Sequence, residues 1–559
     1  MLVTIDTLRA DRLGCYGAER AHTPTVDTLA ASGVRFETAI SPAPLTLPAH
    51  ASLMTGLDPP QHGVRHNSIH RLPDGLPTLA ESMRAAGFRT AAFVGAVVLD
   101  RRFGLARGFD AYDDEGHRWS SPTVGYSERT ADAVVDAALA WLASAPPRFF
   151  LWVHFYDPHA RYAPPPGFAA AFASDRYAGE IAFVDRELGR LLDGIDARFG
   201  RSGRLVVLAS DHGESLGEHG EQTHAYGIYD ATQHIPLILS GVGLPAGRVV
   251  TAPVRLIDVA PTLLAAVGAP PLPGAAGRDL APLIAAPGTD VAAEGEPAYL
   301  ETMATQLDYG WSPLLGLRTR AFKYVRAPRP ELYDLAADPD ELHDLAAARP
   351  EMVERFDALL EQRLGRAAAG SVGVELSESE RASLRSLGYV VPEGGDGGRL
   401  ERRAGPDPKD EIALLRRVAE AEGLAETGHL AEGLALLDEL DDPPPHVRIL
   451  RASLRQNAGQ SARAVEDARR AVAVEPRRVD ARLILAVALE AEGEVAEARS
   501  AFEAALRFEP RSLQAWRGLM RTADRMGDDA AAERARLRVE ALSHPDAVTQ
   551  AEAPPTPLD

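Results

Sequence analysis

The sequence predicts an α/β domain built on a parallel sheet, followed by an all-α array of repeats. Two observations carry this prediction. From residue 1 to about residue 300, short apolar runs with β-branched and aromatic residues alternate with helical patterns. Beyond residue 408 the pattern is purely helical, and several residues recur at a spacing of 34. The 559 residues exceed the ~100 to 200 of a single domain, so we expect more than one domain.

Apolar runs bounded by helical segments are predicted to be strands covered on both faces. The predicted strands are Leu2–Ile5, Thr90–Val94, Phe149–His154, Leu205–Ser210 and Ile235–Leu239. Sheets of this kind bind ligands beyond the carboxyl ends of their strands. Two of the strands run directly into polar residues, the first into Asp6 and the fourth into Asp211 and His212.

The segment 296–335 contains shorter β-like pieces and predicts a small antiparallel unit, followed by a helix over Glu351–Leu364. Gly, Ser, Pro and charged residues then collect over 370–408, which is the composition of a linker. We therefore expect the first domain over 1–368, a linker over 369–407, repeats over 408–545 and a disordered tail over 546–559.

Three sets of markers share one register in the helical segment. They are Gly459, Gly493 and Gly527, then Ala464, Ala498 and Ala532, and the pairs Glu475-Pro476 and Glu509-Pro510. A plain helical bundle has no reason to keep such a register. The segment closely resembles tetratricopeptide repeats, and an earlier unit around Gly428 is shortened. The resemblance implies a protein partner or self-association through the repeats.

Composition excludes several classes of protein. Hydrophobic residues make up 45% and charged residues 25%, as in ordinary globular proteins. The formal charge of -21 repels phosphate backbones, so we expect no nucleic-acid partner. Cys15 is the single cysteine, which excludes an internal disulfide.

The chain contains no apolar run of the ~18 residues that a membrane helix needs, so no transmembrane segment is predicted. A core strand beginning at residue 1 suggests that a natural N-terminus has been lost, along with any targeting signal it carried. The localisation therefore stays open: the chain is expected to be soluble as given, and exported or membrane-anchored if its natural N-terminus is longer.

Asp6 and the sequence Asp211-His212-Gly213-Glu214 are candidate metal ligands. A carboxylate and an imidazole at a strand end can reach one divalent cation, while Gly213 turns the chain. The alternatives are a helix cap for Asp6 and a capped turn for Asp211. Glu214 is interpreted as a hydrogen-bond partner of His212.

Thr46 is predicted to lie at the N-terminus of a short helix that contains Pro48 in its first turn and ends at Gly56. Such a terminus favours an anion. Thr46 is then either an N-cap or a nucleophile, and a nucleophilic hydroxyl needs a metal to lower its pKa.

Together these pieces resemble the alkaline phosphatase superfamily, specifically its sulfatase-like branch, from Leu2 to about Leu345. The motifs that carry the resemblance are 6–11, 23–27, 46–56, 157–159, 210–214 and 331–335. The resemblance implies a metal held by Asp6, Asp211, His212 and the oxygen of Thr46. It also implies anion-binding side chains at His159 and His224.

The sequence departs from sulfatases at the nucleophile. Sulfatases of this fold carry Cys or Ser at the position of Thr46, which is oxidised to formylglycine, and Arg at the position of His50. Because the β-carbon of Thr carries a methyl group, Thr46 cannot give that aldehyde, and no formylglycine is expected. The Lys and His that many sulfatases show after the second predicted strand are also missing from residues 95–98.

Residues 46–67 are instead similar to nucleotide pyrophosphatases and phosphodiesterases, where a Thr attacks phosphorus and an Asn donates to a non-bridging oxygen. Asn67 takes the latter position. Those enzymes bind two zinc ions, and Asp157, His159 and either His224 or His234 could supply a second site here. His219 and His234 also have structural interpretations that involve no metal: His219 as a loop residue, and His234 as a cap at the start of the strand that begins at Ile235.

We therefore expect a metal-dependent hydrolase or transferase acting on phosphoric or sulfuric esters through Thr46, with phosphoryl esters favoured. The metal is expected to be Zn or Mn, with Ca or Mg as alternatives. Two other functions stay open: a formylglycine-independent sulfuric ester hydrolase, and a catalytically weak scaffold that binds a partner through its repeats.

Overall fold

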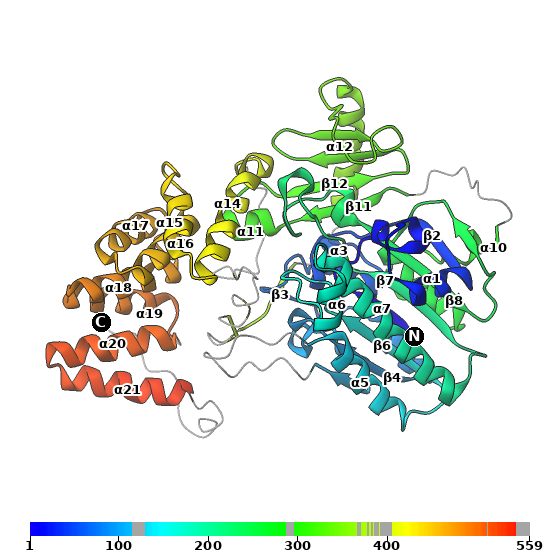
Figure 1. Ribbon diagram of the computed structural model, residues 1–559, viewed down its shortest axis with the longest axis horizontal. Helices are drawn as coiled ribbons and strands as arrows, with labels where there is room; N and C mark the ends of the chain where they lie inside the picture. Colours follow the sequence, from blue (N-terminus) through cyan, green and yellow to red (C-terminus); the bar gives the residue numbers. More distant parts are fainter. Residues whose placement is uncertain are drawn as a thin grey trace. The chain divides into compact units, whose positions relative to one another are not determined.

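A computed structural model of the chain describes residues 1–114, 129–286, 296–365, 370–376, 380–381, 384, 391, 405–510 and 512–543 (Figure 1). The chain forms two compact units. The first holds the described residues of Met1–Glu375 and Ser383–Ile412, and the second those of Leu376–Ala382 and Ala413–Asp559. The glycine-rich centre of the expected linker, 394–398, and the expected tail over 546–559 lie outside the described residues.

The first unit is built on a nine-stranded sheet whose centre is β1 (Leu2–Ile5), between β6 (Phe149–Phe155) and β7 (Leu205–Ser210). All three strands are parallel, and Ile5 is paired with both Phe155 and Ser210. Their carboxyl ends therefore meet at one edge of the sheet. The sheet is completed by β2 (Val34–Ile40), β4 (Arg89–Val94), β5 (Ala111–Asp113), β8 (His234–Gly241), β9 (Arg248–Val250) and β10 (Val254–Arg255).

The prediction of an α/β sheet is confirmed, but β8 runs antiparallel to both β7 and β2, so the sheet is mixed. The connection from β7 to β8 explains this direction. It contains only the turn Glu218–Gly220 and the short helix α8 (Asp230–Gln233), so it lacks the crossover helix that a parallel neighbour requires. The chain instead stays at the carboxyl edge, where this connection carries candidate site residues.

Helices cover both faces of the sheet. The side chains of Val3 and Ile5 share one core with α5 (Ala131–Leu142) and α7 (Arg176–Phe199). Because side chains alternate along a strand, Thr4 points to the opposite face, where it contacts α2 (Thr46–Thr55). Among the described residues, no helix has the length and apolar character that would let it span a membrane.

A four-stranded antiparallel sheet follows, as predicted, with the strand order β11, β12, β13, β14. The strands are β11 (Ala298–Thr302), β12 (Leu314–Arg318), β13 (Phe322–Arg326) and β14 (Glu331–Asp334). Helix α12 (Pro350–Leu364), also predicted, packs on this sheet through Phe356 and Leu360.

The second unit consists of helices joined by tight turns. They are α15 (Leu430–Asp438), α16 (Pro445–Asn457), α17 (Ser461–Val474), α18 (Val479–Glu492), α19 (Val495–Phe508), α20 (Leu513–Met526) and α21 (Asp529–Ser543), preceded by α14 (Pro408–Glu426), whose first residues belong to the first unit. Gly459, Gly493 and Gly527 adopt φ values of 71°, 87° and 72° in the turns within helix pairs. Ala464, Ala498 and Ala532 are buried where helices touch. The 34-residue register is therefore explained by turn and packing positions.

Gly493→Ala is expected to destabilise the second unit by about 1 kcal/mol. Gly493 ends α18 in the left-handed region, and a Cβ there would meet no atom, so the cost is one of backbone conformation alone. Gly423 on α14 also has open space but no left-handed φ, so Gly423→Ala should stabilise the chain. Chemical denaturation followed by circular dichroism measures both effects, and equal stability of the two variants would contradict this account.

Candidate active site

The candidate site lies where β1 and β7 end. Asp6 follows β1, and its N–H donates to the carbonyl of Phe155 at 2.9 Å. Ser210 joins the two strand ends, because its hydroxyl accepts from the N–H of Leu8 at 2.9 Å and donates to the carbonyl of Ile5 at 2.7 Å. Residues about 200 positions apart in the sequence are thereby fixed side by side.

Asp6, Asp211 and His212 are fully buried, and their ligand atoms all lie within 4.8 Å of one another. His212 Nε2 is 3.7 Å from Asp6 Oδ1 and 3.6 Å from Asp211 Oδ2. Since His212 Nδ1 donates to the carbonyl of Gly213 at 2.9 Å, the lone pair of a neutral ring is on Nε2 and faces the carboxylates. Neither His212 Nε2 nor Asp211 Oδ2 has a hydrogen-bond partner.

This donor set fits a divalent cation. Burial raises the pKa of Asp6 to about 7, although His212 and the hydroxyl of Thr46 lower it. Two carboxylates and an imidazole lone pair that are buried together repel one another unless a proton or a metal cation lies among them. Mixed nitrogen and oxygen ligands of this kind suit a metal ion.

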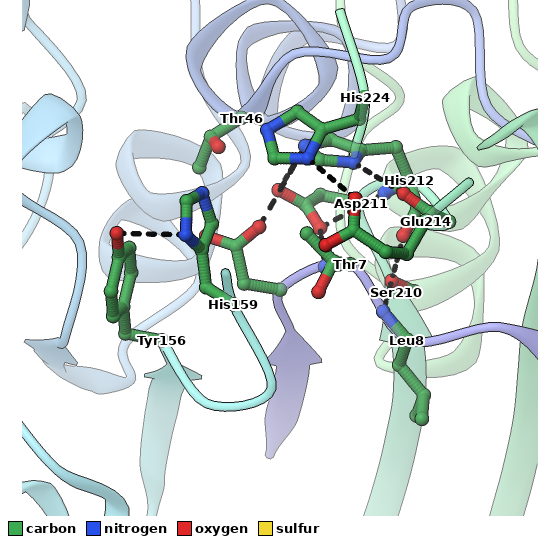
Figure 2. A network of polar contacts seen from close by, with 12 residues as sticks. Thr7, Leu8, Thr46, Tyr156, His159, Ser210, Asp211, His212, Glu214 and His224 are labelled. Carbon is green, nitrogen blue, oxygen red and sulfur yellow. Dashed lines mark hydrogen bonds and ion pairs between the residues drawn. The ribbon is translucent and has the colours of Figure 1, made fainter. Parts of the chain in front are cut away.

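Thr46 is the first residue of α2 and is fully buried. The N-cap position belongs to Leu45, so the interpretation of Thr46 as an N-cap is wrong. Instead, its hydroxyl lies beside the carboxylate of Asp6 and lowers the pKa of that group. Figure 2 shows Thr46, His159, His212 and His224 gathered around Asp211.

Asn67 supplies the cap that Thr46 does not. Its Oδ1 accepts a hydrogen bond from the N–H of Leu47 at 2.8 Å, which fixes the orientation of the amide. Its Nδ2 is buried without a hydrogen-bond partner. A donor is thus held at the N-terminus of α2, next to Thr46.

His159 and His224 face each other on two loops, with ring centroids 5.0 Å apart. His159 Nδ1 donates to the carbonyl of Ala160 at 2.6 Å, and its ring stacks on Tyr156. Burial lowers the pKa of His224 to about 4 and that of His159 well below its usual value. Both rings are therefore neutral at pH 7.

Glu214 contacts His224 rather than His212, the expected partner. Glu214 Oε1 lies 3.0 Å from His224 Nδ1, and Oε2 accepts from the hydroxyl of Tyr162 at 3.0 Å. The carbonyl of Gly213 takes the place beside His212. Burial raises the pKa of Glu214 to about 8.

The second metal site expected at Asp157, His159 and either His224 or His234 is not formed. Asp157 Oδ2 accepts from the N–H of Ala131 at 2.9 Å, so this carboxylate faces the start of α5. His234 Nε2 lies 3.0 Å from the carbonyl of Glu37. Among the described residues, the group of Asp6, Asp211 and His212 alone could hold a metal through three such side chains.

Two histidines that the sequence did not single out as site residues also border the centre. His50 Nδ1 is 3.7 Å from Asp211 Oδ2, and His154 Nε2 is 3.5 Å from Asp6 Oδ2. His50 follows Thr46 by four residues and therefore shares its helix face. His154 lies on β6 beside β1, so the pairing of these strands is the signal that would have found it.

The loops that carry Asn67 and His224 are fastened to one segment of the antiparallel subdomain, β11 and α11 (Ala304–Tyr309). His66 Nε2 lies 3.0 Å from Asp308 Oδ1. Thr302 donates its hydroxyl to the carbonyl of Ala225, and the hydroxyls of Tyr226 and Tyr309 lie 3.3 Å apart. Each loop thus has an anchor directly beside its candidate catalytic residue.

Comparison with known proteins shows which families the two parts of the chain resemble. Residues 1–269 match the family model described as Sulfatase, and residues 479–522 match Tetratricopeptide repeat. The uncharacterized sulfatase YidJ of Escherichia coli is 25% identical over 426 residues, which cover 62% of this chain and 82% of the relative. The Delta 4,5-hexuronate-2-O-sulfatase of Bacteroides thetaiotaomicron is 23% identical over 465 residues, which cover 70% and 94%.

The fold is shared with a phosphonate monoester hydrolase of Agrobacterium radiobacter, with a TM-score of 0.56 and 24% identity over 68% of this chain and 98% of that chain. These relatives and neighbours are named as ester hydrolases. The chain therefore joins a sulfatase-family domain, at its N-terminus, to a tetratricopeptide repeat in its C-terminal part.

Proposed function

We propose that the chain hydrolyses phosphoryl esters that carry a single negative charge, such as phosphodiesters and phosphonate monoesters, with Thr46 as the nucleophile. The observation that carries this proposal is the buried hydroxyl of Thr46 beside Asp6, at the start of α2. A threonine cannot supply the aldehyde on which formylglycine chemistry depends. Its ester with phosphorus must be cleaved by a second attack at the central atom.

Asp6, Asp211 and His212 would hold the divalent metal, with the oxygen of Thr46 as a further ligand. When bound, the metal would lower the pKa of the Thr46 hydroxyl and neutralise charge on the ester oxygens. A set of two carboxylates and one imidazole favours Zn or Mn over Ca or Mg.

The chain's own residues would divide the remaining work. Thr46 would attack phosphorus in line with the leaving oxygen, the bond from phosphorus to that oxygen would break, and water would then cleave the covalent ester of Thr46, which keeps the other substituent on phosphorus. Asn67 Nδ2, fixed by the bond of its oxygen to Leu47, donates to a non-bridging oxygen. His224 can donate from Nε2 to the transferred group when Glu214, whose pKa is raised to about 8 by burial, is protonated and donates to His224 Nδ1. The single hydrogen of His159 is on Nδ1, so its Nε2 lines the site as an acceptor.

The charge around the site supports a singly charged substrate. His50, His159 and His224 are neutral because burial lowers the pKa of each ring. The guanidinium of Arg9 is already paired with the carboxylates of Asp11 and Glu218 and with the carbonyl of Glu214. Because two carboxylates already offset a divalent metal, a doubly charged monoester would add charge that no cationic side chain identified at the site balances.

Sulfuric esters are the second candidate substrate class, because of the proteins that this chain resembles. The relatives in sequence are named sulfatases, whereas a neighbour in fold is a phosphonate monoester hydrolase. A sulfate monoester also carries a single charge and fits the same electrostatics.

For the repeats, we propose binding of a protein partner, since stacked helical repeats present extended surfaces.

A panel of nitrophenyl esters with one leaving group tests this proposal. With the metal-loaded protein, we expect the phosphodiester and the phosphonate monoester to exceed the sulfate and the phosphate monoester in kcat/KM by at least about tenfold, which corresponds to about 1.4 kcal/mol of transition-state stabilisation. A sulfate that turns over faster than both phosphoryl diester-like compounds would establish the formylglycine-independent sulfatase instead. No turnover of any ester by metal-loaded protein would favour the scaffold.

A further inference from the structure

The hydroxyl of Thr4 is the centre of a buried network beneath the candidate site. Thr4 lies on β1, two residues before Asp6, and is fully buried. Its Oγ1 lies 3.0 Å from Trp152 Nε1, 3.0 Å from His154 Nδ1 and 3.1 Å from His50 Nε2. Three ring nitrogens from α2 and β6 therefore converge on one oxygen.

Hydrogen-bond accounting assigns each proton in this network. The indole N–H of Trp152 can only donate. The carbonyl of Thr46 can only accept, so His50 Nδ1, 2.7 Å away, carries a hydrogen, and Nε2 of the neutral ring accepts. The single hydroxyl proton of Thr4 must therefore go to His50. His154 Nδ1 is left as a donor to Thr4, whether or not its ring is charged.

This assignment uses the full capacity of the hydroxyl, one donor and two acceptor lone pairs. It also fixes the orientation of both imidazoles. His50 then holds the carbonyl of Thr46 and lies 3.7 Å from Asp211 Oδ2. His154 presents Nε2 to Asp6 Oδ2 at 3.5 Å. One hydroxyl is thereby linked to the backbone of the nucleophile and to both carboxylates.

We propose that Thr4 is a positioning residue for the reaction, acting through His50 on Thr46 and through His154 on Asp6. This proposal rests on the proposed function of the centre, although Thr4 itself touches neither substrate nor metal. Partners that orient ligands in this way typically contribute 10 to 100-fold to metal affinity or activity. Loss of the Thr4 hydroxyl would leave the N–H groups of Trp152 and His154, and the lone pair of His50 Nε2, buried without their partner.

The test compares Thr4→Val, which keeps the shape and removes the hydroxyl, with Thr4→Ser, which restores it. In the full chain, Thr4→Val should lower kcat about 10 to 100-fold with KM nearly unchanged, and weaken Zn affinity by a similar factor. Thr4→Ser should recover both to within about threefold of the wild type. The matched control is Thr90→Val, because Thr90 is equally buried on β4 and donates its hydroxyl to the carbonyl of Gly108 at 2.7 Å, away from the site.

The control should lose stability and keep wild-type kcat and Zn affinity. Wild-type kcat and Zn affinity in Thr4→Val, or no recovery in Thr4→Ser, would overturn the proposal. If the wild type binds Zn and hydrolyses none of the esters, the proposed function fails, while the Zn affinities of the Thr4 variants still test the role of Thr4.

A measurement on the wild type covers the case in which Thr4→Val does not fold. Nitrogen NMR of the histidine-labelled chain, assigned with His50→Gln and His154→Gln, reports which ring nitrogen carries hydrogen. We expect Nδ1–H for both His50 and His154. An Nε2–H tautomer at His50 would contradict the network and overturn the proposal.

Discussion

Thr46→Ala should lower kcat/KM for the preferred ester by at least about a thousandfold, because the variant has no hydroxyl to attack phosphorus. Thr46→Ser should retain a measurable part of the activity, since a primary hydroxyl can occupy the same place beside Asp6. Steady-state kinetics on the metal-loaded variants measures both effects. A covalent phosphoryl group, detectable by mass spectrometry after rapid acid quenching, should form on the wild type and be absent from Thr46→Ala.

Thr55 offers a matched control for this substitution. It is the last residue of the same helix, is buried, and donates its hydroxyl to the carbonyl of Ala51 at 2.6 Å. Thr55→Ala should cost about 1 kcal/mol of stability and leave kcat/KM within a few-fold of the wild type. Equal activity losses in the two alanine variants would show that helix α2, rather than the Thr46 hydroxyl, is what the reaction needs.

Asp211→Asn should reduce the affinity for the divalent metal by at least about a thousandfold and abolish hydrolysis at ordinary metal concentrations. The amide preserves the shape of the side chain. Its oxygen can keep the bonds that Asp211 Oδ1 accepts from the N–H groups of Thr7 and His212, at 3.3 Å and 2.9 Å. Only the charge and the ligand atom at Oδ2 are lost. Metal analysis of the purified protein and calorimetric titration check the result.

Thermal unfolding separates this effect from a folding defect. Metal should raise the melting temperature of the wild type, because it binds only the folded chain, and should not raise that of Asp211→Asn. When a chelator removes the metal, the melting temperature of the variant should be no lower than that of the wild type. The reason is that the repulsion between the two facing carboxylates is lost when one of them becomes a neutral amide. Asp185→Asn is the control, because Asp185 is a buried carboxylate that accepts N–H bonds from Thr25 and Val26 far from the metal ligands in the sequence. A metal-dependent shift that survives in Asp211→Asn would remove Asp211 from the centre.

The candidate metal ligands could be predicted from the sequence because they follow strands whose ends lie side by side. Each predicted strand is short, apolar and bounded by turns, and Asp6 and Asp211 follow such strands directly. Once β1 and β7 pair in parallel, their following residues must meet at one edge. The repeats could also be predicted from the sequence, because the turn of each unit has a left-handed φ that favours Gly at one fixed position.

The features that the sequence did not reveal depend on contacts between distant segments. His154 lies in an ordinary apolar strand, and its neighbour Thr4 holds the ring that faces Asp6. The carboxylate of Asp157 could chemically serve as a metal ligand, but its Oδ2 accepts a hydrogen bond from the N–H of Ala131 at the start of α5. The reversed direction of β8 depends on a loop that remains at one edge of the sheet, which no periodicity encodes. For His154 and Asp157 the deciding partner lies more than 20 residues away in the sequence.

The loops that carry Asn67 and His224 are held by β11 and α11, so the proposed reaction would also depend on the antiparallel subdomain. All side chains assigned to the reaction lie before residue 225, and the family match ends at residue 269, so an excised fragment would look chemically complete. It would lack Thr302, Asp308 and Tyr309, and the freed loops would have to be ordered anew in every turnover, at a cost in conformational entropy. Substitutions at these three positions offer a way to retune turnover by loosening or tightening two loops, without altering any group that meets the substrate.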